Sequence, residues 1–511
     1  MDRHISADDG NSHMKSGPNI PNCPPTPIND QNSWIPLVSL EEMASKEYDV
    51  IVVGTGAGGG AALWRLCEQW RNTGKRVGVV ERGGLVLPTH AYNLPTKDTA
   101  MNLYNNPRIG IRLGDSLPQF SGARLVQALG GRTLFWGSVC PRIPDFELAE
   151  WPVPIQEMQR YYSIAERVMN VSSLFGRYSS FTQILLDRLR ANGYPEAVEQ
   201  PNAYNIQPTQ YGKIQSNVAF SSIIYLARAM ALHPVDLAVN ARAIQVLTDQ
   251  NYKTRGIRVI TPYNRVYDLQ AKTVVLAASA LETPRILLCS GIPGRAIGHY
   301  LTNHSILSGT GEINSAHFPE ILGNIDILVP QTPHRPYQLQ MTGPYPFYFY
   351  QYLVKPRVNE WKGNNMNTLG KVESRYANRV FLDPIRRDAN GIPEIQVQFS
   401  YSPKDWAVIE QSEVAFRRMA SITGLELEKS GPESSDISLL LPGADSHESG
   451  TCRMGFDPNT SVTDPYCQVH GVPGLFISDN SVLPSMGAIN PTLSTVALAI
   501  RMADHIVRSS N

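Results

Sequence analysis

The feature that most constrains this chain is a glycine-rich turn that follows a strand and opens a helix. Residues 49–53 form a continuous apolar run of strand length, which is typical of a parallel strand covered on both faces. The turn Gly54-Thr55-Gly56-Ala57-Gly58-Gly59 comes next, and residues 61–70 have helical composition. A second apolar strand at residues 76–80 completes a β-α-β unit. The sequence therefore predicts an α/β domain with a parallel sheet.

The spacing G-x-G-x-x-G at this place predicts a dinucleotide site. Gly54 allows a tight turn, Gly56 lets the backbone approach a pyrophosphate, and Gly59 lets helix and strand pack closely. The start of the helix supplies free N–H groups and a partial positive charge for the phosphates. Glu81 ends the second strand, 22 positions after Gly59, where a carboxylate accepts hydrogen bonds from the adenosine ribose and disfavours an NADP phosphate. The expected contacts are Gly54, Thr55, Gly56, Ala57, Gly59, Glu81 and Arg82, and they leave the choice between NAD and FAD open.

Length and charge exclude several other classes of function. A chain of 511 residues exceeds one ordinary hydrophobic core, so two domains are expected. Lys plus Arg and Asp plus Glu are both 45, so the basic excess of a nucleic-acid binder is missing. The six cysteines are scattered, which indicates a reduced, cytoplasmic setting and no metal site. No apolar run of membrane-spanning length and no signal-peptide pattern is present, so a membrane is not expected as a partner. The balanced charge favours a small, neutral or weakly charged substrate.

Residues 1–45 are predicted to form an N-terminal arm. They are rich in Asn, Pro, Ser and Asp, and they bury too little apolar surface to order themselves alone. A flexible arm is one interpretation, and an oligomerisation strap that docks through residues 34–38 is the other. Whether the chain forms a homo-oligomer therefore stays open.

The rest of the chain alternates between predicted helices and strands. Helices are expected at residues 155–170, 180–192, 404–423 and 493–507, and strands at 235–247, 256–266 and 273–277. Aromatic and β-branched enrichment predicts a separate antiparallel sheet from residues 337–341, 345–354, 379–382 and 394–401. The aromatic run 345–352 is interpreted as the core of that sheet, with a sugar-stacking platform as the alternative.

Three further segments carry a more specific pattern. They are Leu129-Gly130-Gly131-Arg132-Thr133-Leu134-Phe135-Trp136-Gly137, residues 276–284 with 297–304, and a C-terminal block that includes His447-Glu448-Ser449-Gly450-Thr451 and Asn490-Pro491-Thr492-Leu493. In sequence and in order they resemble the glucose-methanol-choline (GMC) oxidoreductase family, from residue 48 to 507. Asn490 followed by Pro-Thr-Leu is similar to the pyranose-oxidase-like bacterial branch, because many other members carry a second His there.

The resemblance implies FAD as the cofactor and an interleaved architecture. It implies an α/β fold in which a Rossmann-like FAD-binding domain is interleaved with an α+β substrate domain built on an antiparallel sheet. Residues 46–150, 231–310 and 440–511 would form the FAD-binding domain, and residues 151–230 and 311–439 the substrate-binding domain. The implied substrate is a sugar-like alcohol, such as a sugar, a glycoside or an aminoglycoside, with oxygen or another carrier as the electron acceptor.

The resemblance also assigns further cofactor contacts. Residues 129–137 resemble the family's glycine pair and the aromatic loop over the isoalloxazine ring. Pro491-Thr492 would open the last helix toward the flavin pyrimidine. Phe135 stands where pyranose oxidases have the histidine that binds flavin covalently, so the FAD is expected to be noncovalent. Gly137 replaces a threonine of that group, so the wall near flavin N5 is expected to differ. The implied contacts are Gly130, Gly131, Thr133, Phe135, Trp136, Gly137, Ala243, Ala278, Ser279, Asp479, Asn480, Pro491 and Thr492.

His447 and Asn490 are the implied catalytic pair. Oxidation of a carbinol needs a base for the hydroxyl proton and an acceptor for the hydride. His447 is expected to be the base and flavin N5 the acceptor, because an imidazole takes up a proton near neutral pH. Asn490 is expected to donate its amide N–H to the substrate oxygen. An NAD-dependent dehydrogenase and a non-catalytic flavin- or sugar-binding protein are the alternatives, and His304 and His470 are assigned structural roles.

Overall fold

The computed structural model describes residues 35–94, 99–177, 179–208, 214–314, 318, 324–343, 364–429 and 435–510. Met1–Leu37 separates from the compact unit Val38–Asn511, which contains all helices and strands of the described residues. Most of the predicted N-terminal arm lies outside the described residues, and so does the aromatic strand predicted at 345–354.

Ordered structure begins before residue 45, where the predicted arm ends. Helix α1, Leu40–Ala44, buries Leu40 and Met43. The Ser39 side chain accepts the Glu42 N–H at 3.1 Å and so caps the first turn. The boundary of the arm is corrected accordingly, because a capped turn with two buried apolar side chains is ordered by the fold.

A mostly parallel sheet carries the glycine-rich turn. Its five parallel strands lie in the order β9, β2, β1, β12 and β21, so the first strand of the chain is central. In that order their bounds are Val235–Ala238, Val77–Val80, Glu47–Val53, Val266–Leu276 and Leu475–Ile477. Strands β10, Arg242–Thr248, and β11, Thr254–Ile260, extend the sheet in antiparallel pairing. Dinucleotide-binding sheets have this parallel strand order, and their ligands lie beyond the carboxyl ends of the strands.

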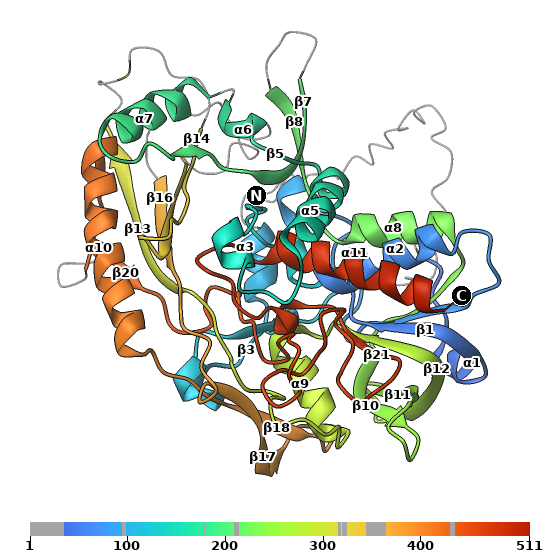
Figure 1. Ribbon diagram of the computed structural model, residues 1–511. Coiled ribbons are helices and arrows are strands. Elements are labelled where there is room, and N and C mark those ends of the chain that lie inside the picture. The colour runs from blue at the N-terminus through green and yellow to red at the C-terminus, as the bar shows by residue number, and fades with distance from the viewer. Residues whose placement is uncertain are drawn as a thin grey trace, which may run out of the picture. The chain divides into compact units, whose positions relative to one another are not determined.

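Helices from both ends of the chain cover this sheet. α2, Ala57–Gln69, begins in the glycine-rich turn, and α11, Thr492–Ser509, lies beside it (Figure 1). α8, Ile223–Leu232, packs on α2, and α5, Ile155–Met169, packs on α11. Residues 493–504 of α11 are all buried, so the C-terminal segment belongs to the core that supports the turn.

The strand predicted at 235–247 is instead two strands. β9 joins β2 in parallel, whereas β10 joins β11 in antiparallel pairing. The break occurs near Asn240, whose φ of 52° lies in the left-handed region. Asparagine adopts this conformation more readily than most residues, which ends the extended run.

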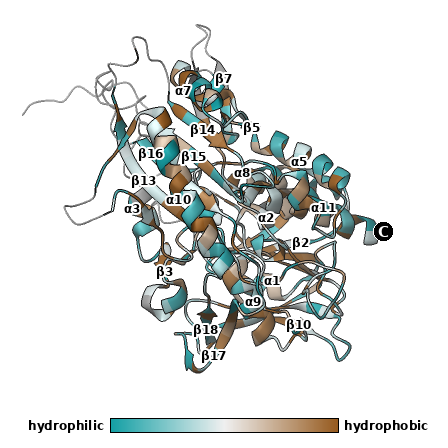
Figure 2. Cartoon of the chain, turned by 60° about the vertical axis from the view of Figure 1, so that its left-hand side comes forward, coloured by the Kyte–Doolittle hydropathy of each residue, from teal (hydrophilic) through white to brown (hydrophobic). Residues whose placement is uncertain are grey.

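A second sheet is antiparallel throughout and lies in the order β19, β13, β16, β15, β14 and β6, with β20 beside β13. Helices α10, Pro403–Thr423, and α7, Ser180–Ala191, pack around its core. Figure 2 shows hydrophobic colour on β14 and mixed colours along α10, as expected for a helix with one face on a core. In sheet order the strand bounds are Leu425–Leu427, Ser305–Ile313, Asn364–Gly370, Tyr337–Gly343, Ile325–Val329, Val198–Glu199 and, for β20, Ser438–Leu439.

The strand segments near residues 380 and 395 do not join this sheet, which corrects the prediction of one antiparallel sheet. β17, Arg379–Arg387, and β18, Pro393–Gln398, pair only with each other among the named strands. β15 pairs with β14 and β16 instead. Strands of similar composition therefore occur both in a short hairpin and in a sheet formed by long-range pairing.

The remaining elements are short, and no helix among the described residues is long and apolar enough to cross a membrane. The helices are α3 Thr99–Asn105, α4 Asp145–Leu148, α6 Leu174–Arg177 and α9 Ser279–Cys289. The strands are β3 Gly110–Arg112, β4 Arg124–Val126, β5 Val171–Ser172, β7 Asn202–Pro208 and β8 Ile214–Ala219. Turns of 3-10 helix cover Ala91–Asn93, Gly114–Ser116, Pro118–Phe120, Gly131–Leu134 and Asn480–Val482.

Candidate active site

A cavity of about 470 Å³ lies at the carboxyl ends of the parallel strands. Its wall includes Val53 and Val80, which end β1 and β2, and Ala277, which follows β12. The C-terminal block contributes residues 444–448 and Asn490. Cofactor and small-molecule sites usually span roughly 300–1,000 Å³, so both place and size suit such a ligand.

Most residues singled out from the sequence line this cavity. Three do not, namely Gly59, Gly130 and Pro491, although each adjoins a residue that does. The residues in the wall are His447, Asn490, Gly54, Thr55, Gly56, Ala57, Glu81, Arg82, Gly131, Thr133, Phe135, Trp136, Gly137, Ala243, Ala278, Ser279, Asp479, Asn480 and Thr492.

The glycine-rich turn is crowded on one side and open on the other. A side chain at Gly59 would place its Cβ 2.1 Å from the Gly54 carbonyl oxygen and 3.0 Å from the Ala277 Cβ, so Gly59 allows the close contact of helix and strand. A Cβ at Gly56 would have no neighbour within 4 Å. The turn therefore leaves space for a ligand at Gly56.

Thr55 connects Glu81 to Gly130. The Thr55 N–H and Oγ1–H donate to Glu81 Oε2 at 2.9 and 2.7 Å, and the Gly83 N–H donates to Oε1 at 2.9 Å. The Gly130 N–H donates to Thr55 Oγ1 at 2.9 Å. Burial raises the pKa of Glu81, and these donors oppose the rise. Since a carboxylate oxygen has two lone pairs, Oε1 keeps one for a ligand hydroxyl.

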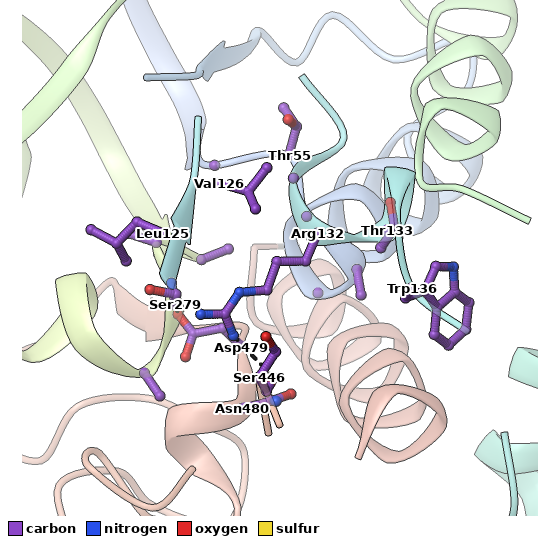
Figure 3. A pocket seen from close by; sticks show the side chains of 18 of the residues that line it. Thr55, Leu125, Val126, Arg132, Thr133, Trp136, Ser279, Ser446, Asp479 and Asn480 are labelled. Atoms are coloured by element: carbon purple, nitrogen blue, oxygen red, sulfur yellow. Dashed lines mark hydrogen bonds between the residues drawn. The ribbon is translucent and has the colours of Figure 1, made fainter. Parts of the chain in front are cut away.

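The aromatic loop is fixed by its polar atoms. Trp136 Nε1 donates to the Phe220 carbonyl at 2.8 Å, and Thr133 Oγ1 accepts the Ser222 N–H at 2.9 Å. Figure 3 shows Thr133 and Trp136 beside the pocket, on the segment that also carries Arg132. A Cβ at Gly137 would meet nothing within 4 Å, so the loop is open at that point.

Asp479 ties the C-terminal block to the segment after β12. Its Oδ2 accepts the Ser279 N–H at 3.0 Å and the Thr283 Oγ1–H at 2.6 Å, and its Oδ1 accepts the Ser481 N–H at 2.9 Å. Burial raises the pKa of Asp479, while these donors favour the ionised form. Ser279 is held with φ of 90°, a strained value for a residue with a Cβ. The carboxylate thus fixes the backbone of this turn at the cavity wall.

The donor set fits a dinucleotide. Helices α2 and α11 both begin at the cavity, and neither N-cap, Gly56 or Pro491, supplies a side-chain cap. The N–H groups of their first turns therefore remain available, and the helix dipoles favour a negatively charged group there. Together with the open space at Gly56, this arrangement suits the pyrophosphate and the flavin pyrimidine of FAD.

His447 lies against a second histidine. The Nδ1 atoms of His447 and His304 are 2.9 Å apart, and Asp445 Oδ2 lies 3.9 Å from each. Burial, and then the positive charge of Arg132, lowers the pKa of His447 well below its usual value. Burial likewise lowers the pKa of His304. Both rings are therefore neutral near pH 7, and within the described residues no hydrogen bond engages His447 Nε2.

These three side chains resemble a partial metal site. His304, Asp445 and His447 bring ligand-type atoms within 4.8 Å of one another. The two Nδ1 atoms already share a hydrogen bond, whereas a metal needs a lone pair from each. The hydrogen bond therefore occupies atoms that a metal ion would need, and it holds the two rings against each other.

Arg132 and Glu448 join the aromatic loop to the His447 loop. Arg132 Nη2 donates to Glu448 Oε1 at 3.1 Å, Nη1 donates to Oε2, and Nη1 also donates to the Ser446 carbonyl at 3.0 Å. Figure 3 shows the Arg132 side chain reaching across the pocket toward Ser446. Glu448 is buried, and the bidentate ion pair compensates its charge. The pair fixes two loops that lie far apart in the sequence.

Two glutamines of β15 hold Asn490. Gln338 Nε2 and Gln340 Nε2 donate to Asn490 Oδ1 at 2.9 and 2.7 Å. Asn490 and His447 line the same cavity, so the structure brings the two expected catalytic side chains to one space.

Sequence reasoning did not assign Arg132, Glu448, Gln338 or Gln340. Arg132 and Glu448 are charged residues inside glycine-containing segments, and that unusual placement was the available signal. The glutamines alternate with apolar residues along β15, a period of two that indicates one polar face. The pattern did not reveal which residue that face contacts.

Comparison with known proteins identifies relatives along most of the chain. The GMC oxidoreductase family pattern matches residues 50–306 and 373–499, which contain the three segments named above and the glycine-rich turn. A 2-methyl-1,2-propanediol dehydrogenase of Mycolicibacterium austroafricanum is 24% identical, over 91% of this chain and 96% of its own length. A paromamine 6'-oxidase of Streptomyces fradiae is 25% identical over 89% and 90%, and a pyranose 2-oxidase of Tricholoma matsutake is 24% identical over 76% and 73%. The last match agrees with the branch suggested by residues 490–493.

Proposed function

The chain belongs to the GMC oxidoreductase family, and from this membership we propose that it uses FAD to oxidise a CH–OH group of a sugar-like alcohol. The observation that carries the proposal is that His447, Asn490 and the glycine-rich turn line one cavity. Relatives named as a pyranose oxidase and a paromamine oxidase support a sugar, glycoside or aminoglycoside as substrate. Oxygen or another carrier would then take the electrons away.

The wall residues divide between the two ends of the cofactor. The first turn of α2 after Gly56 would bind the pyrophosphate, and Glu81 Oε1 would accept a ribose hydroxyl. The first turn of α11, at Thr492, would face the flavin pyrimidine. When bound, FAD supplies the hydride acceptor, its N5 atom.

His447 would take the proton of the substrate hydroxyl on Nε2. This role requires the tautomer in which His447 Nδ1 carries hydrogen and donates to His304 Nδ1, 2.9 Å away. Burial keeps the ring neutral, so a lone pair is present at physiological pH. Asn490 Nδ2 would donate to the same substrate oxygen as negative charge develops on it.

The FAD would be bound noncovalently. Phe135 lines the cavity, and its benzyl side chain has no nucleophilic atom for a bond to the flavin. Acid precipitation is therefore expected to release all flavin into the supernatant. Yellow colour that stays with the pellet would contradict this expectation.

We also propose that the residues around the two sheets have different roles, FAD binding and substrate binding. Residues 46–150, 231–310 and 440–511 would bind FAD around the parallel sheet. Residues 151–230 and 311–439 would bind the substrate, and they supply β14, β15 and β16 of the antiparallel sheet, which holds Asn490 through Gln338 and Gln340.

Anaerobic reduction of the FAD-loaded protein tests the proposal. Sugars, glycosides, aminoglycosides and simple 1,2-diols are mixed with the yellow protein, and the loss of flavin absorbance is followed. Bleaching by a sugar-like member of the panel is expected. A colourless protein that responds only to NAD would favour a nicotinamide-dependent dehydrogenase, and a yellow protein that no alcohol bleaches would indicate binding without turnover.

A further inference from the structure

The two ends of the Asn490 carboxamide have different surroundings. Gln338 Nε2 and Gln340 Nε2 both donate to Oδ1, at 2.9 and 2.7 Å. A carbonyl oxygen has two lone pairs, so these two donors fill its capacity. Within the described residues, no protein acceptor is hydrogen-bonded to Nδ2, and the side chain lines the cavity. Its two N–H groups are thus left for a ligand.

Strand β15 holds the two glutamines rigidly. Residues two apart in a strand point to the same face, so Gln338 and Gln340 reach Asn490 together. Leu339 and Met341 point to the other face and belong to the core of the antiparallel sheet. β15 is paired on both edges, with β14 and with β16, and this pairing fixes the positions of both glutamines in the sheet.

Gln338 is poorly explained as a packing residue. Its side chain is fully buried, and its Oε1 has no hydrogen-bond partner. A buried acceptor without a donor destabilises a fold, and an apolar residue of similar size would avoid that cost. A glutamine at this position therefore points to a role for its other end, the Nε2 that meets Asn490.

We propose that Gln338 and Gln340 are positioning residues that lock the Asn490 carboxamide with Nδ2 toward the substrate oxygen. The inference rests on the proposed function, in which Nδ2 stabilises the developing alkoxide. With the opposite orientation, Oδ1 would face that alkoxide, and the partial negative charge of the amide oxygen would repel it. Because neither glutamine ionises, the lock is independent of pH.

Gln340→Glu should make the orientation of the Asn490 carboxamide depend on pH. A protonated Glu side chain still donates to Oδ1, whereas an ionised one only accepts and would draw Nδ2 away from the cavity. The limiting rate of anaerobic flavin reduction should fall as pH rises through the pKa of the new carboxyl, by roughly 10²–10³. It should recover as the pH is lowered again, with a smaller change in the substrate concentration for half-maximal rate.

Gln331→Glu is the matched control. Gln331 is also buried, and its Oε1 accepts the N–H of Ala488, a residue close to Asn490 in the sequence. Gln331 does not line the cavity. A glutamate keeps that acceptor, so the pH profile of flavin reduction should match that of the unmodified chain. Thermal unfolding at both ends of the pH range verifies that the variants are folded.

Gln340→Met covers the case in which Gln340→Glu does not fold or does not bind FAD. It removes one of the two donors and should lower the limiting rate by roughly two- to tenfold. An unchanged rate in Gln340→Met, or a Gln340→Glu profile like that of the unmodified chain, would overturn the lock. If the unmodified chain itself is bleached by no alcohol, the proposed function fails instead, which separates the two outcomes.

Discussion

The two sides of the candidate active site are built from different chemistry. Around His447 stand ionisable groups, namely His304, Asp445, and the ion pair of Arg132 with Glu448. Asn490, on the other side, is held by the uncharged carboxamides of two glutamines. One side adjusts how strongly a ring binds a proton, whereas the other adjusts only the direction of a donor. The roles proposed above, a base at His447 and a hydrogen-bond donor at Asn490, would account for this difference, because a base needs a tuned pKa and a donor does not.

Removal of His447 should have the largest effect. His447→Ala deletes the proton acceptor, and the limiting rate of anaerobic flavin reduction should fall by about 10⁴, the upper end for general-base catalysis. Asn490→Ala is the comparison, with a loss of roughly 10²–10³. Stopped-flow absorbance measures both, and the spectrum of bound flavin should be unchanged in each. A His447→Ala rate within tenfold of the parent would remove this residue from the reaction.

Arg132→Met should change the pH dependence on the His447 side. Burial, and then the charge of Arg132, lowers the pKa of His447. Only the neutral ring accepts a proton, so activity should be lost as the pH falls through that pKa. Without the guanidinium the pKa rises, and the acid limb of kcat/KM should move to higher pH. At a fixed acidic pH, the rate should fall about tenfold for each pH unit by which the limb moves. Glu448→Gln keeps the arginine and should not move the limb upward; equal profiles for both variants would refute the assignment.

His304→Gln should have the smallest of the expected effects, a change in how the stability of the fold depends on pH. The folded state lowers the pKa of His304, so below about pH 6.5 the unfolded chain binds more protons and stability falls as the pH falls. Replacement should flatten this dependence by up to about 1.4 kcal/mol per pH unit. Urea unfolding between pH 7 and about pH 5 measures it. Gln338→Leu, on the uncharged side, should shift the level of stability and leave its slope with pH unaltered.

Local patterns predicted the region around the glycine-rich turn well. The strand at residues 49–53, the turn from Gly54 to Gly59 and helix α2 are consecutive in the chain, so apolar runs and glycine spacing were sufficient. The end of α11 and the limits of α5 and α7 followed from helical periodicity to within three residues. Such signals depend on neighbours in the sequence, and they hold when the fold does not override them.

Pairings across long distances were not predictable. Residues 337–341 and 379–382 have similar strand composition, yet the first joins β14 and β16 and the second forms a hairpin with β18. Gln340 lies 150 positions before Asn490, and Arg132 lies 316 positions before Glu448. Tertiary packing decides which side chains meet at such separations, and composition and spacing contain no information about that packing.

The three-residue strand β21 has a consequence for the biosynthesis of the protein. It pairs with β12 and leads directly to Asp479, so a late part of the chain completes a sheet that β1 begins. Translation makes β1 long before β21, and the nascent chain therefore lacks one wall of the cavity until residues 444–490 have emerged from the ribosome. The complete cavity can consequently form only after these residues have been made, and a polypeptide terminated before them would carry the glycine-rich turn without this wall.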